Sequence, residues 1–67
     1  MILARVTGPN FVAGLLLDER GCCVRAAPIL RWTIGLYRDA LRVEFRRLGW
    51  HAAVIGSATE AHPLLCR

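Results

Sequence analysis

The chain has 67 residues, a formal net charge of +4 at pH 7 and 55% hydrophobic side chains, and all nine of its basic residues are arginine. This length excludes a second domain and leaves little room for an enclosed catalytic cleft, because so small a domain buries only roughly 60% of its unfolded surface. The apolar content excludes a disordered basic tail. We therefore expect one small basic domain over residues 1–67, with a core at 2–56 and a tail at 57–67.

The first half of the chain predicts three strands. Residues 2–6 are β-branched and apolar around one arginine, and residues 11–17 are apolar on both faces, which favours a central strand. The polar turn at 18–21 closes a hairpin with a return strand at 22–27. Alternation in that return strand predicts two faces, with Cys22, Val24 and Ala26 on one and Cys23, Arg25 and Ala27 on the other.

The second half predicts one main helix and a last strand. Pro28 suits the start of a helical turn that breaks or kinks at Gly35, and the helical signal is strong from Leu36 onward. One apolar stripe at helical spacing comprises Ile34, Tyr37, Leu41, Phe45 and Leu48. Gly49 then ends the helix in a left-handed conformation that returns Trp50 onto Phe45.

Residues 51–55 predict a final strand, which Gly56 and Ser57 break, and residues 58–67 form a tail or a partly docked extension. The order of elements is therefore β-β-β-α-β. It predicts the α+β class: a mostly antiparallel sheet of three or four strands, with one main helix packed on one face.

Composition gives little support for membrane, metal or catalytic roles. The longest uncharged apolar stretch, residues 11–17, is far shorter than the ~20 residues that span a bilayer, so we expect a cytoplasmic protein without membrane contact. The three cysteines are odd in number and are expected to be free thiols. A metal site using His62 and Cys66 lacks a Cys-x2-Cys pair, and nothing orients His51 as a base for Cys22. We expect no metal, no cofactor and no enzymatic activity.

The placement of the arginines is the most informative feature for function. Arg38, Arg42 and Arg46 stack at helical spacing beside the apolar stripe, and we call them the arginine ridge. Arg31 extends the ridge only if the kink at Gly35 leaves it in register. Asp39 can reach Arg42 and Glu44 can reach Arg47, which leaves Arg38 and Arg46 without an acidic partner. The guanidinium fork binds phosphates and carboxylates alike, so three alternatives stay open: a solvated helix face, a nucleic-acid contact or an acidic protein patch.

Two aromatic residues, Trp32 and Tyr37, flank the kink near this ridge. An exposed aromatic beside the ridge would allow stacking on nucleobases, whereas the simpler interpretation gives Trp32 and Trp50 to the core. The sequence has no helix-turn-helix, zinc-finger or aromatic-rich RNA-binding pattern. The candidate partner-binding residues are accordingly Arg31, Tyr37, Arg38, Arg42 and Arg46.

Three segments, residues 11–15, 27–32 and 48–50, together resemble a family of small uncharacterised phage and prophage proteins. The resemblance covers roughly residues 8–55, and its pattern is carried by Phe11, Gly14, Pro28, Trp32, Gly35, Gly49 and Trp50. These are turn glycines and core aromatics, so the likeness supports the fold more than an activity. Small phage proteins often act by occlusion, and an anti-CRISPR protein that blocks an effector complex is the sharpest form of what the resemblance implies.

The leading hypothesis is therefore a non-enzymatic phage-type interaction protein that inhibits a nucleic-acid-processing complex, such as a CRISPR effector in the host cytoplasm, by steric blockade. Many anti-CRISPR proteins are acidic, so the basic charge of this chain argues against a mimic of DNA. It favours contact of the ridge with an acidic protein surface, or with nucleic acid alongside the target. The alternatives are a sequence-independent nucleic-acid-binding module that uses the ridge and a phage structural or assembly module. The sequence leaves the oligomeric state open.

Overall fold

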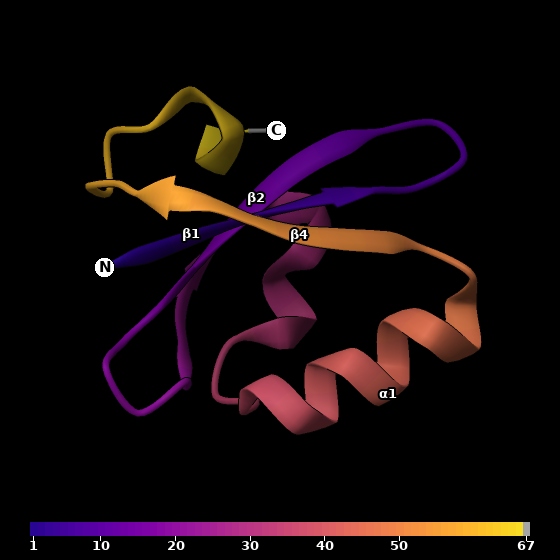
Figure 1. The fold of residues 1–67 in the computed structure, drawn as a ribbon. Coiled ribbons are helices and arrows are strands. Elements are labelled where there is room, and N and C mark those ends of the chain that lie inside the picture. The colour runs from indigo at the N-terminus through magenta and orange to yellow at the C-terminus, as the bar shows by residue number, and fades with distance from the viewer. Residues whose placement is uncertain (67) are drawn as a thin grey trace.

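In the computed structural model, which describes residues 1–66, a four-stranded antiparallel sheet carries one main helix on one face (Figure 1). The strands are β1 (Ile2–Thr7), β2 (Val12–Leu17), β3 (Cys23–Ala26) and β4 (His51–Ser57). The 3-10 helix η1 (Pro28–Thr33) and the α-helix α1 (Arg38–Leu48) separate β3 from β4, and a second 3-10 helix, η2 (Pro63–Cys66), follows. The predicted α+β class and its β-β-β-α-β order are confirmed.

The sheet order is β3-β2-β1-β4, so β1 and β2 are its two central strands. Five of the six residues of β2 are buried, as expected for a strand whose sequence is apolar on both faces. β4 pairs with β1 alone and forms one edge of the sheet. Among the helices of residues 1–66, none is long and apolar enough to cross a membrane.

The predicted alternation over residues 22–27 is right for Cys23 and Ala27, which share the main core cluster, and wrong for Ala26. A bulge between Leu16 and Leu17 lets Cys23 pair with Leu17 while Arg25 pairs with Leu16. Cys23 is consequently buried, and Ala26 packs against the same core cluster instead of facing the opposite side. A bulge adds one residue to a strand and so reverses the face of every side chain beyond it.

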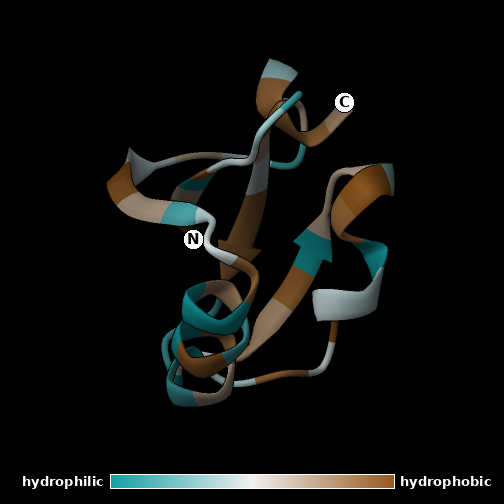
Figure 2. Ribbon diagram, turned by 90° about the vertical axis from the view of Figure 1, so that its right-hand side faces the viewer, coloured by the Kyte–Doolittle hydropathy of each residue, from teal (hydrophilic) through white to brown (hydrophobic). Residues whose placement is uncertain are grey.

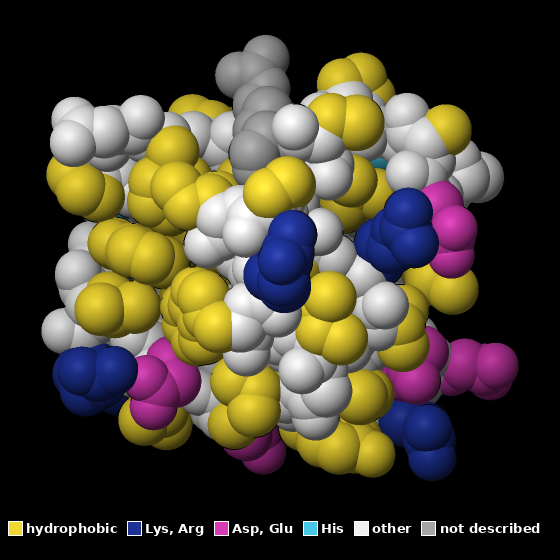
Figure 3. Space-filling view, turned by 180° about the vertical axis from the view of Figure 1, so that it is seen from behind, with side chains coloured by type: hydrophobic (Ala, Val, Ile, Leu, Met, Phe, Trp, Pro, Cys, Tyr) yellow, Lys and Arg dark blue, Asp and Glu magenta, His cyan; other side chains and the backbone are white. Residues whose placement is uncertain are grey.

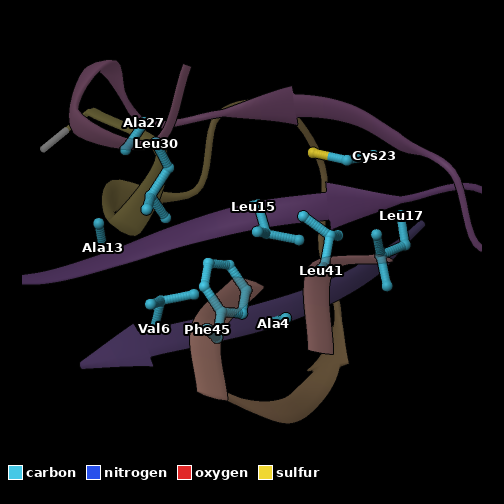
Figure 4. Close-up of a cluster of buried hydrophobic side chains, with 10 residues drawn as sticks. All are labelled: Ala4, Val6, Ala13, Leu15, Leu17, Cys23, Ala27, Leu30, Leu41 and Phe45. Carbon is cyan, nitrogen blue, oxygen red and sulfur yellow. The ribbon is translucent and has the colours of Figure 1, made fainter. Parts of the chain in front are cut away.

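The main core lies between the sheet and the layer formed by α1 and η1 (Figure 4). Leu41 and Phe45 of α1 point toward the sheet, where the buried side chains include Ala4, Val6 and Leu15. Full burial of a leucine or phenylalanine side chain contributes about 1.5–3 kcal/mol each, so these contacts set the position of α1 on the sheet.

The predicted apolar stripe is only partly buried. Leu41 and Phe45 are buried, whereas Leu48 is exposed and Ile34 and Tyr37 lie outside α1 and are exposed as well. Gly35 has a φ of 94°, which breaks the chain direction between η1 and α1, so the helical spacing does not continue across it. Figure 2, in which α1 is seen nearly end-on, shows hydrophilic residues over much of the helix surface.

The C-terminal segment packs on the opposite face of the sheet. Leu65 is buried in a second cluster with Leu3 and Leu16, and Leu64 contacts that cluster. Gly14 makes this approach possible, because a Cβ at that position would lie 2.8 Å from the Cβ of Leu64. The predicted break at Gly56 and Ser57 is wrong, since β4 continues to Ser57 by pairing with the start of β1. Of the two predicted alternatives, a tail or a partly docked extension, the second describes the residues of this segment up to Cys66.

Candidate binding groove between α1 and β4

The turn after α1 brings β4 back alongside the helix. Gly49 has a φ of 76°, its N–H bonds to the Arg46 carbonyl at 3.1 Å, and the Trp50 N–H bonds to the Phe45 carbonyl at 2.9 Å. These two bonds form the Schellman motif, which closes a helix through a left-handed residue. Figure 1 shows α1 running in one direction and β4 returning above it in roughly the opposite direction.

A groove of about 480 Å³ runs between the helix and this strand. Its helix side presents the three ridge arginines above Leu41 and Phe45. Its sheet side is formed mainly by small or apolar residues: Ala4, Leu15, Leu17, His51, Ala52, Ala53 and Val54, with Trp50 at the turn. The groove therefore combines a basic wall with a largely apolar surface.

The ridge arginines are exposed, and none of the ion pairs found among residues 1–66 includes them. The sequence expectation that Asp39 pairs with Arg42 is not met by any ion pair in that part of the chain. All three guanidinium groups of the ridge are thus available to a ligand from outside.

Three arginines elsewhere are paired with carboxylates. Arg47 bonds to Glu44 at 2.6 Å, as predicted, and Arg20 and Arg25 lie 3.7 Å and 3.9 Å from Asp18 and Glu60. The face in Figure 3 shows the consequence, because each basic side chain there stands alone or lies against an acidic one on a mostly apolar surface. Arg5 and Arg31 are also in none of the ion pairs found among residues 1–66, but they lie apart from the groove, where the three ridge arginines stand together.

The structure separates two of the five candidate residues from this site. Arg31 lies in η1, beyond the break at Gly35, and does not line the groove. Tyr37 precedes α1 and lines a second hollow of about 470 Å³ whose acidic residues are Asp18, Glu19 and Asp39. Arg38, Arg42 and Arg46 are the candidates that the fold brings together.

Four of the five aromatic residues form one cluster at the C-terminal end of α1, and Tyr37 at the other end of the helix is not part of it. Trp50 meets Phe11 edge-to-face with 4.9 Å between ring centroids and stacks on Phe45 at 6.2 Å, and Trp32 meets Phe45 edge-to-face at 5.9 Å. Trp50 is thus engaged by three other rings although it lines the groove, and Trp32 does not line it. Trp50 packs against the main core cluster, whereas Trp32 is 42% exposed, so the interpretation as a core residue holds for Trp50 and not for Trp32.

The cysteines are free thiols in three different environments: Cys22 is half-buried, Cys23 is buried and Cys66 is exposed. Burial raises the pKa of the Cys23 thiol, although its Sγ lies 3.4 Å from the Thr33 hydroxyl oxygen, a contact that acts the other way. Over residues 1–66 no three His, Cys, Asp or Glu side chains are grouped closely enough to hold a metal ion.

The turn before β3 depends on one carboxylate. Asp18 accepts hydrogen bonds from the Cys22 and Arg20 backbone N–H groups, each at 2.9 Å. The bond from Cys22 is the main reason that the pKa of Asp18 is lowered, and the nearby Arg20 charge adds to the effect. This carboxylate stabilises the hairpin and lies away from the groove.

Sequence reasoning found the ridge but missed β4 as the opposite wall. All seven residues of β4 are exposed, including Val54 and Ile55. The available signal was the absence of any charged residue from 51–57, which is unusual for an exposed edge strand.

Comparisons with protein-family models, curated proteins and solved structures give no match to this chain. The resemblance to small phage proteins stays a prediction from the sequence.

Proposed function

We propose that this chain is a non-enzymatic binding module that accommodates an acidic segment of a protein partner in the groove between α1 and β4. The observation that carries the proposal is the arginine ridge, whose three guanidinium groups have no ion pair within residues 1–66 and line a groove with an apolar sheet side. Carboxylates would bind the guanidinium forks, and apolar side chains of the same segment would cover the alanines and Val54.

The groove favours a polypeptide over a nucleic acid for two reasons. The phosphate backbone offers no apolar groups for the Ala4, Ala52 and Val54 side of the groove. Stacking of bases needs an accessible aromatic face beside the basic groups. In the groove, Trp50 is already engaged by Phe11, Phe45 and Trp32. The exposed Tyr37 lies in the other hollow, whose three acidic residues would repel phosphates. Nucleic-acid binding through the ridge is the alternative that the experiment below distinguishes.

Two triple variants test this proposal with equal change in charge. The ridge variant carries Arg38→Gln, Arg42→Gln and Arg46→Gln; the paired-arginine variant carries Arg20→Gln, Arg25→Gln and Arg47→Gln. Each loses three positive charges, so the net charge falls from +4 to +1 in both. The probes are a fluorescein-labelled peptide of alternating Glu and Val and a labelled 20-nucleotide oligothymidine, measured by fluorescence anisotropy.

Exposed ion pairs contribute about 0.2–1 kcal/mol each, so the loss of three predicts a peptide affinity lower by about 3- to 150-fold, with about 20-fold at the middle of the range, for the ridge variant. The paired-arginine variant should stay within about threefold of the unmodified chain, since its arginines face elsewhere. Equal losses in both variants would mean that bulk charge alone drives binding. Tighter binding of oligothymidine, lost in the ridge variant alone, would favour the nucleic-acid alternative.

The predicted resemblance to small phage proteins extends this proposal to a mechanism. A body of 27 × 24 × 19 Å that docks through one groove leaves most of its bulk outside the contact, where it obstructs other ligands of the partner. We therefore keep steric inhibition of a nucleic-acid-processing complex, a CRISPR effector among them, as the proposed role. Binding to a purified effector complex, together with loss of interference in cells, would support it if the ridge variant abolished both. Failure to bind any effector complex, with interference intact, would contradict it.

A further inference from the structure

The outer edge of β4 is open, unlike the opposite edge of the sheet. At the β3 edge, residues 21–23 are hydrogen-bonded to residues 35–38: Cys23 donates to the Leu36 carbonyl at 2.8 Å, and Gly35 donates to the Cys23 carbonyl at 2.8 Å. β3 is also only four residues long. β4 is seven residues long, fully exposed, and paired with β1 alone in the part of the chain that the structure describes.

The register shows which backbone groups of β4 face outward. The Met1 carbonyl accepts the Ala58 N–H at 3.0 Å, so the backbone groups of Met1 point toward the β4 side of β1. The Gly8 N–H bonds to the Phe11 carbonyl on the β2 side. The backbone groups of the odd-numbered residues of β1 therefore point toward β4, and those of the even-numbered residues toward β2. Arg5 and Thr7, which lie opposite Ala53 and His51, therefore direct their backbone groups toward β4. Backbone direction alternates along a strand, and this leaves the N–H and C=O groups of Ala52 and Val54 pointing away from the sheet.

The same two residues line the groove. Ala52 and Val54 lie opposite Val6 and Ala4, whose side chains belong to the core beneath α1. A strand paired with β4 would place every second side chain on this α1 side. Charged residues, prolines, a bulge or a covering element usually protect such an edge. Residues 51–57 contain neither charges nor prolines. A bulge falls between Val54 and Gly56, so residues 51–54 are the regular part of the open edge.

The spacing of the ridge matches the spacing of such a strand. Residues four apart on a helix are roughly 6 Å apart along its axis, and alternate residues of a strand are roughly 7 Å apart. Arg38, Arg42 and Arg46 follow the first spacing along a helix that runs roughly antiparallel to β4 (Figure 1). Three carboxylates at alternate positions of an added strand can therefore each meet one ridge arginine.

We propose that the acidic segment adds to the open edge of β4 as a fifth strand, with acidic side chains at alternate positions facing the arginine ridge. This inference rests on the proposed function and specifies the form of its ligand. The partner's backbone would bond to Ala52 and Val54, as in recognition by strand addition, and its carboxylates would supply the specificity.

A second copy of the chain fits this edge less well. Pairing of two β4 strands about a two-fold axis would place both α1 helices on one face of the joined sheet. Six ridge arginines, three from each copy, would then lie above the two central strands, where their like charges oppose association. An acidic segment would instead be attracted by the ridge arginines, because its carboxylates carry the opposite charge.

The test uses the labelled peptide Glu-Val-Glu-Val-Glu-Val-Glu and a derivative N-methylated at two adjacent central residues. Adjacent residues point to opposite edges, so one methyl group blocks pairing with β4 in either orientation of the peptide. On the protein side, Ala52→Pro removes an outward N–H, and its control is the same variant measured with the N-methylated peptide, which cannot use that N–H. Circular dichroism checks that each variant is folded.

N-methylation and Ala52→Pro should each weaken peptide binding by about tenfold or more, whereas Ala52→Pro should change the affinity for the N-methylated peptide by less than about threefold, because that pairing is already lost. If the N-methylated peptide binds the unmodified chain as tightly as its parent while the ridge variant does not bind, strand addition is wrong and the proposed function stands. If the ridge variant binds the parent peptide as well as the unmodified chain does, the proposed function itself fails. A dimer seen by analytical ultracentrifugation and abolished by Ala52→Pro would assign the edge to a second copy and overturn the inference.

Discussion

Trp50 stacks on Phe45 with 6.2 Å between ring centroids and donates its backbone N–H to the Phe45 carbonyl at 2.9 Å. One pair of residues thus fixes both the end of α1 and the start of the strand that follows. Because Phe45 is buried against the sheet, the pair also sets where the arginine ridge stands relative to β4. The geometry of the groove depends on this turn.

Substitution of Gly49 tests the turn directly. Gly49→Ala should destabilise the domain by about 1–2 kcal/mol, because an L side chain is disfavoured in the left-handed region. A Cβ at this position would meet nothing within 4 Å, so steric overlap does not contribute. Thermal unfolding should show a melting temperature lower by several degrees, since about 1 kcal/mol corresponds to about 4–8 °C in a domain of this size. D-alanine at position 49 is the control and should leave the stability unchanged or higher; equal melting temperatures for the two alanines would contradict the explanation.

The close approach of η2 to β2 predicts a coupling between Gly14 and Leu64. Gly14→Ala should destabilise the domain by about 1–3 kcal/mol, because the new methyl group forces η2 away from the sheet. Leu64→Gly removes the Cβ that the new methyl group would meet at 2.8 Å. In a double-mutant cycle followed by urea unfolding, Gly14→Ala should therefore cost less in the Leu64→Gly background. Strictly additive changes in the free energy of unfolding would show that the two residues are not in contact.

The lowered pKa of Asp18 predicts a stability difference that depends on pH. A carboxyl whose folded-state pKa lies below its ordinary value of 3.8 stabilises the fold above that pH, and the contribution is lost as the pH falls through the folded-state pKa. Asp18→Ala should therefore lower the melting temperature most at pH 7 and progressively less below about pH 4.

Asp18→Asn is the control for the charge of this residue, because its amide oxygen can still accept from the Arg20 and Cys22 N–H groups. At pH 7 the melting temperature of Asp18→Asn should fall between those of the unmodified chain and the alanine variant. At pH 2 it should approach that of the unmodified chain. A difference between the unmodified chain and Asp18→Ala that stays constant from pH 7 to pH 2 would rule out this contribution.

The three thiols should react at different rates. Iodoacetamide at pH 8 should modify Cys66 first and Cys22 next, because the thiolate is the reactive form and access decides its rate. Cys23 is 1% exposed and burial raises its pKa, so its alkylation should require opening of the structure and should accelerate in urea. Peptide mass spectrometry measures the three rates separately. Similar rates for Cys23 and Cys66 without denaturant would contradict the buried position of Cys23.

Local sequence signals predicted those parts of the fold that local chemistry determines. Gly49 and Trp50 marked the end of α1, since the left-handed cap and its returning aromatic lie within a few residues of each other. The ridge followed from helical spacing alone. Pairing between distant segments decided the rest: the bulge at Leu16 and Leu17 reverses a face of β3, and the position of β4 at an edge depends on the strand order.

Arg31 shows why the candidate site could be predicted only in part. Its spacing from Arg38 suits a continuous helix, but Gly35 separates η1 from α1 and leaves Arg31 outside the groove. The opposite wall of the groove was not predicted, because nothing in residues 51–57 says which strand lies beside them.

The most direct test of the binding groove is a ¹⁵N-resolved NMR titration of the full chain with the alternating Glu-Val peptide. We expect the largest shifts on the Ala52 and Val54 amides and on the side-chain N–H groups of the ridge arginines. The side chains of Arg20, Arg25 and Arg47 serve as internal references, because each already lies beside a carboxylate. Shifts of similar size on those three arginines, with β4 unaffected, would contradict binding in the groove.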